Sequence, residues 1–306
     1  MEEKKFDPYQ FIGFILIALI LTWMLYRNGP AEESAKEPVS SEEVLQQNTT
    51  PTNANQQNDS IIQQQTLAAY GDLGSLFVPN QQESLKLNTN EMSLEISPKG
   101  GQLTKLTLNQ YENYEDAPIP MINEGNSDFN IEISTFDGRV IHTRDMFFSS
   151  STREGADAIE VEMKASLGPQ QYLLFQYRFP KKGYLYSLSF KTVGMQSIMN
   201  PAIAPKLIWK TDVFRNSRSI DYENRYTEYT FGYEEDRVDY LSLSGSDEET
   251  RQGIRWISYR QHFFSAILIP ELPIAEAKIA SRDRSSEEGL NEKFTKTFTT
   301  AYALNT

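Results

Sequence analysis

The strongest constraint on this chain is an uninterrupted apolar run near its start. Residues 9–26 read YQFIGFILIALILTWMLY and contain no formally charged side chain. As a helix the run is about 27 Å long at ~1.5 Å per residue, close to the hydrocarbon thickness of a bilayer. We therefore expect residues 9–26 to cross a membrane once, with residues 1–8 as a short tail before the span.

The run is predicted to stay on the chain as an anchor. A signal peptide has an apolar core of about 7–15 residues, followed by a cleavage site made of small residues. Here the core is longer and ends in Trp23 and Tyr26, residue types that concentrate at membrane interfaces. The nearest small residues, Ala31 and Ala35, lie among Pro and Glu residues and make a poor cleavage site.

The charges beside the span do not fix its orientation. Lys4 and Lys5 precede it, while Arg27 and Lys36 follow it, so the positive-inside rule gives no preference. The sequence has no cysteine, which fits an oxidising compartment but also a reducing one. A short tail before a large C-terminal part favours an extracytoplasmic domain.

The next two segments are predicted to connect the anchor to a folded domain. Residues 27–60 are rich in Gln, Asn, Ser, Thr and Glu, so burial would not offset the entropy of ordering them, and we expect a flexible tether. Residues 61–83 form a lead-in with a short amphipathic helix, which Gly71 and Gly74 are expected to interrupt.

From residue 84 onward the hydrophobic pattern changes to a period of two. Apolar and polar residues alternate over 92–97, 129–134, 159–165 and 184–191, as in half-buried antiparallel strands. Gly-containing turn signals separate these segments, at 99–101, 137–138, 182–183 and 244–246. Further strands are expected at 206–214, 226–233, 238–243, 254–269, 274–280 and 294–303. Residues 84–306 are therefore predicted to form one large all-β antiparallel sandwich.

The sequence offers little for catalysis. It has no cysteine and only two histidines, His142 and His262, which lie far apart in the sequence and belong to no known metal or nucleophile motif. The formal net charge of −13 argues against nucleic-acid binding, which needs clustered basic residues. We predict a protein that is not an enzyme and has no catalytic residue, cofactor, metal site or nucleic-acid partner.

Aromatic residues gather between 222 and 240. Exposed, they would make a platform for sugars or a surface for a protein partner, and buried they would belong to the sandwich core. Tyr229, Phe231 and Tyr233 alternate and so lie on one face of a strand, which favours the core.

Two stretches follow the anchor and the Gln/Asn-rich tether. The first, LKLNTNEMSLEISPKGGQLTKLTLNQY, has a strand, a Gly-Gly turn and a second strand, with Ile96, Gly100, Gly101, Leu108 and Tyr111. The second, GIRWISYRQHFFSAILIP, has a Trp, a Gln-x-Phe and an apolar strand, with Trp256, Gln261, Phe263 or Phe264, Ala266 and Pro270. In this order, the anchor, the tether and the two stretches resemble the YidC family of bacterial membrane insertases, in the form found in Bacteroidota.

The resemblance implies a fold, a location and partners. The N-terminus would be cytoplasmic, the span would lie in the inner membrane, and the domain would be a periplasmic β-super-sandwich related to sugar mutarotases. The implied partners are membrane lipid, the Sec components SecD, SecF and SecY, and nascent membrane proteins. The family's insertase core is a helical bundle after this domain, so the chain is expected to be an N-terminal fragment with an accessory, protein-binding role. Eight of the motif residues are assigned structural roles: Gly100, Gly101, Leu108, Tyr111, Trp256, Gln261, Phe264 and Pro270. The partner-binding residues stay unassigned.

An alternative function is a membrane-anchored carbohydrate-binding or mutarotase-like periplasmic protein. Mutarotase chemistry needs a general acid and a general base, typically Glu and His, on either side of a sugar ring. Neither His142 nor His262 has an obvious acidic partner in the sequence, so the accessory function is preferred.

Overall fold

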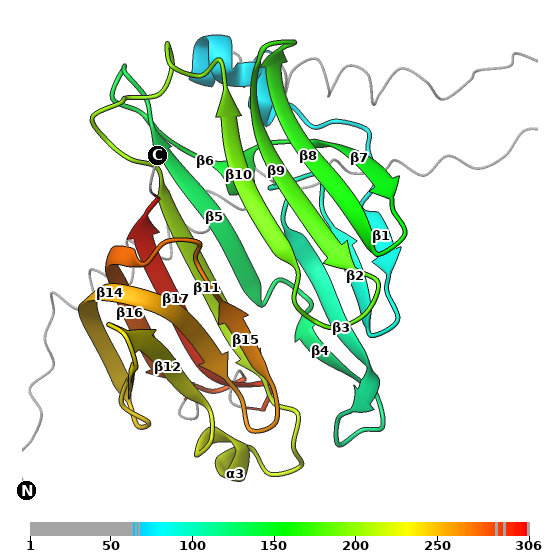
Figure 1. Ribbon diagram of the computed structural model, residues 1–306, viewed down its shortest axis with the longest axis vertical. Helices are drawn as coiled ribbons and strands as arrows, with labels where there is room; N and C mark the ends of the chain where they lie inside the picture. The colour runs from blue at the N-terminus through cyan, green and yellow to red at the C-terminus, as the bar shows by residue number, and fades with distance from the viewer. Residues whose placement is uncertain (1–63, 65, 67, 285–286, 290–291, 305–306) are drawn as a thin grey trace, which may run out of the picture. The chain divides into compact units, whose positions relative to one another are not determined.

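The computed structural model describes residues 64, 66, 68–284, 287–289 and 292–304 (Figure 1). The predicted span at 9–26 and the tether at 27–60 lie outside these residues, so their assignments stay predictions. Within the described part of the chain, no helix has the length and apolar character needed to cross a membrane.

The lead-in helix is interrupted at the first of its two glycines. Residues 68–70 are α-helical, and Gly71 then adopts a left-handed φ of 58°, which a right-handed helix cannot continue. The 3₁₀ helix η1 (Gly71–Phe77) begins there and includes Gly74, so, contrary to expectation, the second glycine does not interrupt the helix. Leu73, Leu76 and Phe77 on η1 are buried in the core of the domain.

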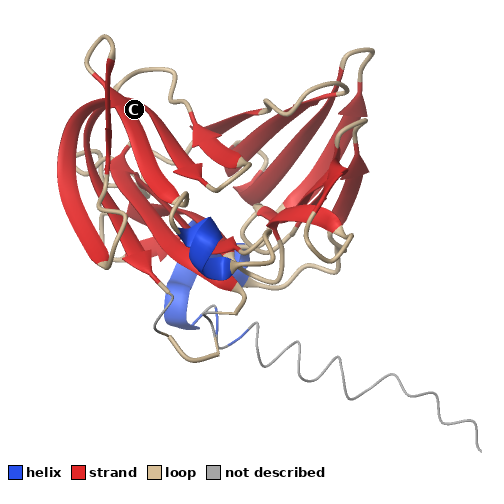
Figure 2. Cartoon of the chain, turned by 90° about the horizontal axis from the view of Figure 1, so that it is seen from below, coloured by secondary structure: helices blue, strands red, loops and turns tan. Residues whose placement is uncertain are grey.

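The regular secondary structure of the described chain is almost entirely antiparallel strand, with only short helices, coloured blue in Figure 2. This confirms the predicted all-β class. Two of its sheets are four-stranded, with the orders β1-β2-β3-β4 and β10-β9-β8-β7. Their strands are β1 (Leu85–Asn88), β2 (Met92–Ile96), β3 (Leu103–Glu112), β4 (Pro118–Ile122), β7 (Ser149–Glu154), β8 (Ala158–Gly168), β9 (Gln171–Pro180) and β10 (Ser187–Val193).

The third sheet is nine-stranded, in the order β13-β12-β14-β16-β17-β11-β5-β6, with β15 paired to β14. The short helices η2 (Thr143–Asp145) and α3 (Ile220–Asn224) follow β6 and β11 along the chain. The strands are β5 (Ser127–Ser134), β6 (Val140–His142), β11 (Lys206–Phe214), β12 (Glu228–Tyr233), β13 (Arg237–Tyr240), β14 (Ser246–Arg260), β15 (Ser265–Leu268), β16 (Ile274–Asp283) and β17 (Phe294–Ala303).

One predicted strand is wrong in its extent. Residues 254–269 do not form a single strand, because the chain reverses between Arg260 and Ser265. The backbone N–H of Gln261 donates to the carbonyl of Phe264 at 2.7 Å and closes the turn, so that β15 pairs back onto β14. The turn, RQHFF, contains neither Gly nor Pro, so the sequence gives no turn signal at this position.

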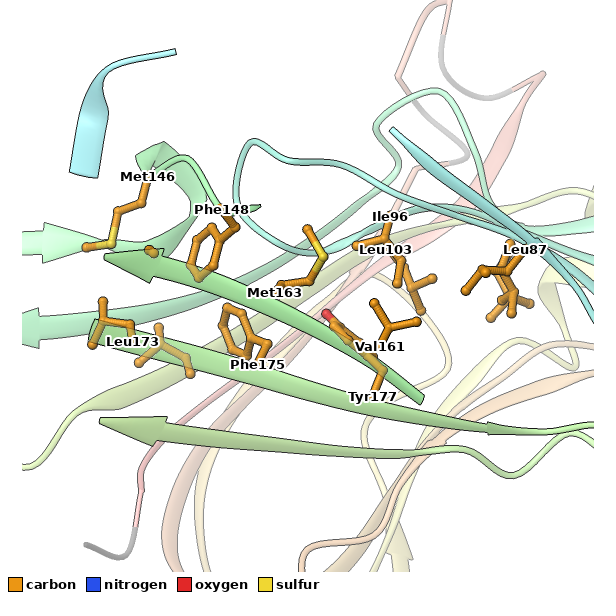
Figure 3. Close-up of a cluster of buried hydrophobic side chains, with 14 of the residues drawn as sticks. Leu87, Ile96, Leu103, Met146, Phe148, Val161, Met163, Leu173, Phe175 and Tyr177 are labelled. Carbon is orange, nitrogen blue, oxygen red and sulfur yellow. The ribbon is translucent and has the colours of Figure 1, made fainter. Parts of the chain in front are cut away.

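The first core lies against both four-stranded sheets (Figure 3). The Gly100-Gly101 turn packs directly on it, with φ angles of 83° and 61°. A Cβ on Gly101 would lie 3.0 Å from Cγ of Phe148, and the Gly101 carbonyl accepts a hydrogen bond of 2.8 Å from the Tyr177 hydroxyl. Glycine is needed here for both its positive φ and its small size.

The second core belongs to the nine-stranded sheet. Tyr229 and Phe231 are fully buried in it, as their alternation predicts, while Tyr233 is half-buried against it. Trp256 lies outside both cores and is half-buried over Gly232, where a Cβ would fall 2.1 Å from the indole Nε1. The aromatic residues of 222–240 therefore divide, because Tyr222, Tyr226 and Tyr240 are exposed.

Candidate functional site: an apolar groove

A groove of about 1990 Å³ lies among the described residues. All three sheets contribute to its walls: Leu106 and Met121 come from the first, Leu188 from the second, and Trp209 and Leu268 from the third. A pocket for a small ligand usually measures about 300–1,000 Å³. The groove therefore has room for more than one small molecule and suits a chain-like ligand.

Exposed apolar side chains surround the groove. Leu185 and Phe263 are 74% and 70% exposed, although both line it. Most large apolar side chains of a folded domain are buried, and a cluster of exposed ones marks a contact surface. We call this set the apolar rim, and its members are Tyr111, Tyr184, Leu185, Phe263, Ile267, Ile269 and Leu272.

The segment 263–272 contributes much of the rim because it is apolar on both faces. Phe264, Ala266 and Leu268 pack against the cores. The residues between them point outward, and Ile267 is 55% exposed. Within the described part of the chain, β15 pairs with β14 alone, so its other edge carries unpaired backbone groups. An apolar strand with an open edge is a template for binding an extended polypeptide.

The electrostatics of the groove do not favour catalysis. The charged residues in its lining include Arg153 and Glu160, which form an ion pair with each other. Burial raises the pKa of Tyr186 and of Tyr302 to about 12, so both phenols are neutral at physiological pH. Among the residues that the structure describes, no three His, Cys, Asp or Glu side chains gather as a metal site.

Neither histidine lines this groove. His142 ends β6, where its Nδ1 lies 3.1 Å from Nδ2 of Asn130 and 3.7 Å from a carboxylate oxygen of Glu132. His262 lies in the turn between β14 and β15 and lines a smaller pocket beside the groove. A His–carboxylate pair facing a sugar across the groove is thus not formed by these residues.

The predicted motif residues fall into three places. Gly100 and Gly101 shape the turn on the first core, where Leu108 is also buried. Trp256 covers Gly232, and the buried Gln261 accepts a hydrogen bond of 2.7 Å from the Asn216 amide. Tyr111, Phe264 and Pro270 line the groove, and the buried Leu108 lines it as well.

Two of the groove-lining motif residues touch each other. Tyr111, at the end of β3, meets the ring of Phe264 edge-on with centroids 5.3 Å apart. The ring of Tyr184 lies on the other side of Tyr111, 6.4 Å away. This contact joins the second stretch of the motif to the first across the groove.

Sequence reasoning missed the apolar rim. The signal for it was present in FFSAILIP, where apolar residues occupy both parities of a strand instead of alternating with polar ones. Leu185 falls in the predicted strand 184–191, on its otherwise polar face, whereas the structure begins β10 at Ser187 and places Leu185 in the connection before it.

The comparisons with known proteins agree on one family. The profile of the YidC periplasmic domain matches residues 84–304. The chain is 26% identical over 290 residues to a protein of Porphyromonas gingivalis named membrane protein insertase YidC, covering 90% of this chain and 46% of that protein. It is also 26% identical over 283 residues to a protein of the same name from Parabacteroides distasonis, covering 87% and 44%. The chain thus spans about half the length of the curated relatives that it matches.

A solved structure is similar at low identity. It is a galactose mutarotase-like protein from Lactobacillus casei, with a TM-score of 0.38, 8% identity, and coverage of 72% of this chain and 87% of that one.

Proposed function

The chain belongs to the YidC periplasmic domain family, and we propose that it is the anchor and periplasmic domain of an inner-membrane protein insertase. Its relatives carry that name and are about twice as long. In this proposal the insertion activity belongs to the part of the protein outside this chain. Residues 1–306 act as an accessory module that binds proteins and turns over no substrate.

The observation that carries the proposal is the groove with its apolar rim. We propose that it holds an extended apolar segment of a nascent membrane protein. Such a segment would cover side chains such as Leu185 and Ile267, and each buried CH₂ contributes about 0.8 kcal/mol. The open edge of β15 supplies backbone hydrogen bonds that do not depend on the bound sequence.

The location follows from the same proposal. Residues 9–26 would hold the domain at the inner membrane, with the N-terminus in the cytoplasm and residues 84–306 in the periplasm. SecD, SecF and SecY are then the proposed neighbours of the domain. External protease added to spheroplasts should digest the domain, and protection that lasts until the membrane is lysed would contradict this orientation.

Peptide binding tests the groove directly. We would place the full chain in lipid nanodiscs and measure the fluorescence anisotropy of a labelled peptide with a central Leu/Ala run. The double variant Leu185→Ser, Ile267→Ser should weaken binding at least about tenfold, because two exposed contacts lose apolar area.

A matched control separates the groove from general surface hydrophobicity. Val238 is 61% exposed but does not line the groove, so Val238→Ser should leave the affinity unchanged. Equal losses in both variants, or no binding by the unaltered chain beyond that of empty nanodiscs, would refute the proposed function.

A further inference from the structure

A second pocket adjoins the groove. It has a volume of about 480 Å³ and shares three residues with the groove, Glu112, Phe263 and Phe264. Its other walls come from the turn after β3 and from the segment between β11 and α3, including Tyr114, Asn216 and Arg218. The size lies within the range of pockets that bind small groups, about 300–1,000 Å³. A chain lying in the groove can therefore place one side chain in this pocket.

The walls of the pocket are aromatic. The ring of His262 stacks on Tyr226 with centroids 4.6 Å apart and meets Tyr222 edge-on at 5.2 Å. Phe263 is the next residue along the chain, and its ring centroid lies 3.8 Å from that of His262. Phe263 is 70% exposed. Tyr222 lines the pocket and is 46% exposed, so its ring remains open to a ligand, whereas Tyr226 is not a lining residue and supports the His262 ring. Aromatic walls favour a planar apolar ring in offset or edge-on contact.

The pocket also presents a buried acceptor that has no partner. Asn216 is only 6% exposed, and its Nδ2 donates to Oε1 of Gln261 at 2.7 Å. Its backbone N–H donates to the Glu223 carboxylate at 2.8 Å, which fixes the residue in place. Its side-chain oxygen Oδ1 is buried and has no hydrogen-bond partner in the part of the chain that the structure describes, and the same holds for Nδ1 of His262. Buried polar atoms are nearly always paired in folded proteins, so an unpaired acceptor in a pocket points to an external donor.

We propose that this pocket receives a Trp or Tyr side chain of a polypeptide whose apolar neighbours lie in the groove. The inference rests on the proposed function. The aromatic walls take the ring, and the indole N–H or phenol O–H donates to Oδ1 of Asn216. Membrane-spanning segments carry Trp and Tyr at their ends, so a donor-bearing ring beside an apolar run is a common feature of the proposed ligand class.

The experiment compares peptides that differ at one position. Labelled Leu/Ala-run peptides carrying Trp, Tyr, Phe or Leu at one end are titrated with the full chain in lipid nanodiscs, with empty nanodiscs as the baseline. The Trp and Tyr peptides should bind about 3- to 10-fold more tightly than the Phe peptide, the value of one added hydrogen bond. In Asn216→Leu this preference should vanish, while the affinity for the Leu peptide is unchanged.

Two further variants control for damage to the loop. Asn216→Asp keeps an acceptor oxygen and should keep the preference for Trp over Phe. Arg225→Leu changes an exposed residue that lines neither the pocket nor the groove, and it should keep the preference as well. An unchanged affinity for the Leu peptide in each variant shows that the groove is still folded.

The possible outcomes distinguish a failure of the pocket proposal from a failure of the groove proposal. Binding of the Leu peptide without any preference for Trp or Tyr would overturn the pocket proposal and leave the groove proposal standing. A preference that persists in Asn216→Leu would also overturn it. Loss of the Trp preference on adding free glucose would assign the pocket to a sugar ring instead. Failure of every peptide to bind would overturn both proposals.

Discussion

Two aromatic clusters of the domain are built from similar residue types but differ in whether their polar atoms have hydrogen-bond partners within the protein. The interior cluster is made of Tyr229, Tyr259 and Phe298, with ring centroids 5.2–5.7 Å apart. The Tyr259 hydroxyl donates to the carbonyl of Trp209 at 2.8 Å, and both tyrosine hydroxyls contact Oγ1 of Thr300. Every hydroxyl of the interior cluster thus has a partner inside the protein.

The surface cluster consists of Tyr222, Tyr226, His262 and Phe263, with Asn216 beneath them. Its rings also contact one another, at centroid distances of 3.8–5.2 Å. Here, however, Nδ1 of His262 and Oδ1 of Asn216 are buried without a partner among the described residues. The contacts between rings do not distinguish the two clusters, whereas the pairing of polar atoms does. The interior cluster satisfies its own hydrogen bonds, and the surface cluster leaves two polar atoms unpaired, one of which is the acceptor in the proposed pocket.

The largest expected effect lies in the interior cluster. Phe298 is fully buried between Tyr229 and Tyr259. Phe298→Ala should lower the free energy of unfolding by about 3–5 kcal/mol, because it removes a buried ring and leaves a cavity. Urea unfolding of the full chain in mild detergent, followed by circular dichroism, measures the loss. A loss under about 1 kcal/mol would show that the surrounding strands collapse into the space.

The second effect tests the hydrogen bonds of the interior cluster. Thr300→Val keeps the shape of the side chain but removes the hydroxyl shared by Tyr229 and Tyr259. We expect a loss of about 1–3 kcal/mol, since a buried tyrosine hydroxyl is left without one of its partners. The same unfolding measurement applies. A neutral result would mean that the tyrosines find other partners, and the contrast between the two clusters would weaken.

The third effect depends on pH and concerns Glu223, the residue after Tyr222 of the surface cluster. Burial raises the pKa of Glu223, against the opposing effect of backbone hydrogen bonds from Ser217 and Asn216. The folded chain then holds this proton more tightly than the unfolded chain. The free energy of unfolding should therefore rise as the pH falls through the folded-state pKa, and this rise should level off below the unfolded value near 4.5.

The variant Glu223→Gln isolates this component, because glutamine does not titrate. On acidification, the unaltered chain should gain unfolding free energy relative to the variant. The gain should be about 1.4 kcal/mol for each unit by which the folded-state pKa exceeds the unfolded-state pKa. Both proteins would carry His262→Phe, so that the neighbouring imidazole adds no titration of its own. A difference that stays flat from neutral pH to pH 4.5 would contradict a raised pKa.

The sequence predicts the parts of the fold in which one face of a strand is buried. The alternation over residues 92–96 becomes β2, whose residues are alternately buried and half-buried. β9 has no such alternation, since Leu173, Leu174 and Phe175 are all buried, and the pattern does not predict it. A period of two appears in the sequence only when one face of a strand is buried and the other is exposed. It is absent when both faces are buried.

The groove and its pocket were beyond sequence reasoning for a different reason. Leu106 and Leu268 line the same cavity from positions far apart in the chain. Local sequence patterns do not predict which sheets contact one another. The unpaired state of Oδ1 in Asn216 is likewise a property of its surroundings, since an asparagine in a polar loop is ordinary in sequence. The resemblance to a family supplied the residues that matter most for the groove, Tyr111, Phe264 and Pro270, but without a role.

The smallest expected effect is the sharpest test of the comparison. His262→Phe keeps a ring of similar shape stacked on Tyr226 and removes Nδ1, which has no partner in the folded chain. No intramolecular hydrogen bond is lost, so the free energy of unfolding should change by less than about 0.5 kcal/mol at a pH where histidine is neutral.

Tyr259→Phe is the matched change in the interior cluster, because it also removes one polar atom from an aromatic ring. That atom donates to the carbonyl of Trp209 and contacts Thr300, so we expect a loss of about 1–2 kcal/mol by the same unfolding measurement. If His262→Phe costs as much as Tyr259→Phe, then Nδ1 of His262 has a partner within the protein. The surface cluster would in that case be part of the fold, like the interior one, and only the acceptor of Asn216 would remain for a ligand.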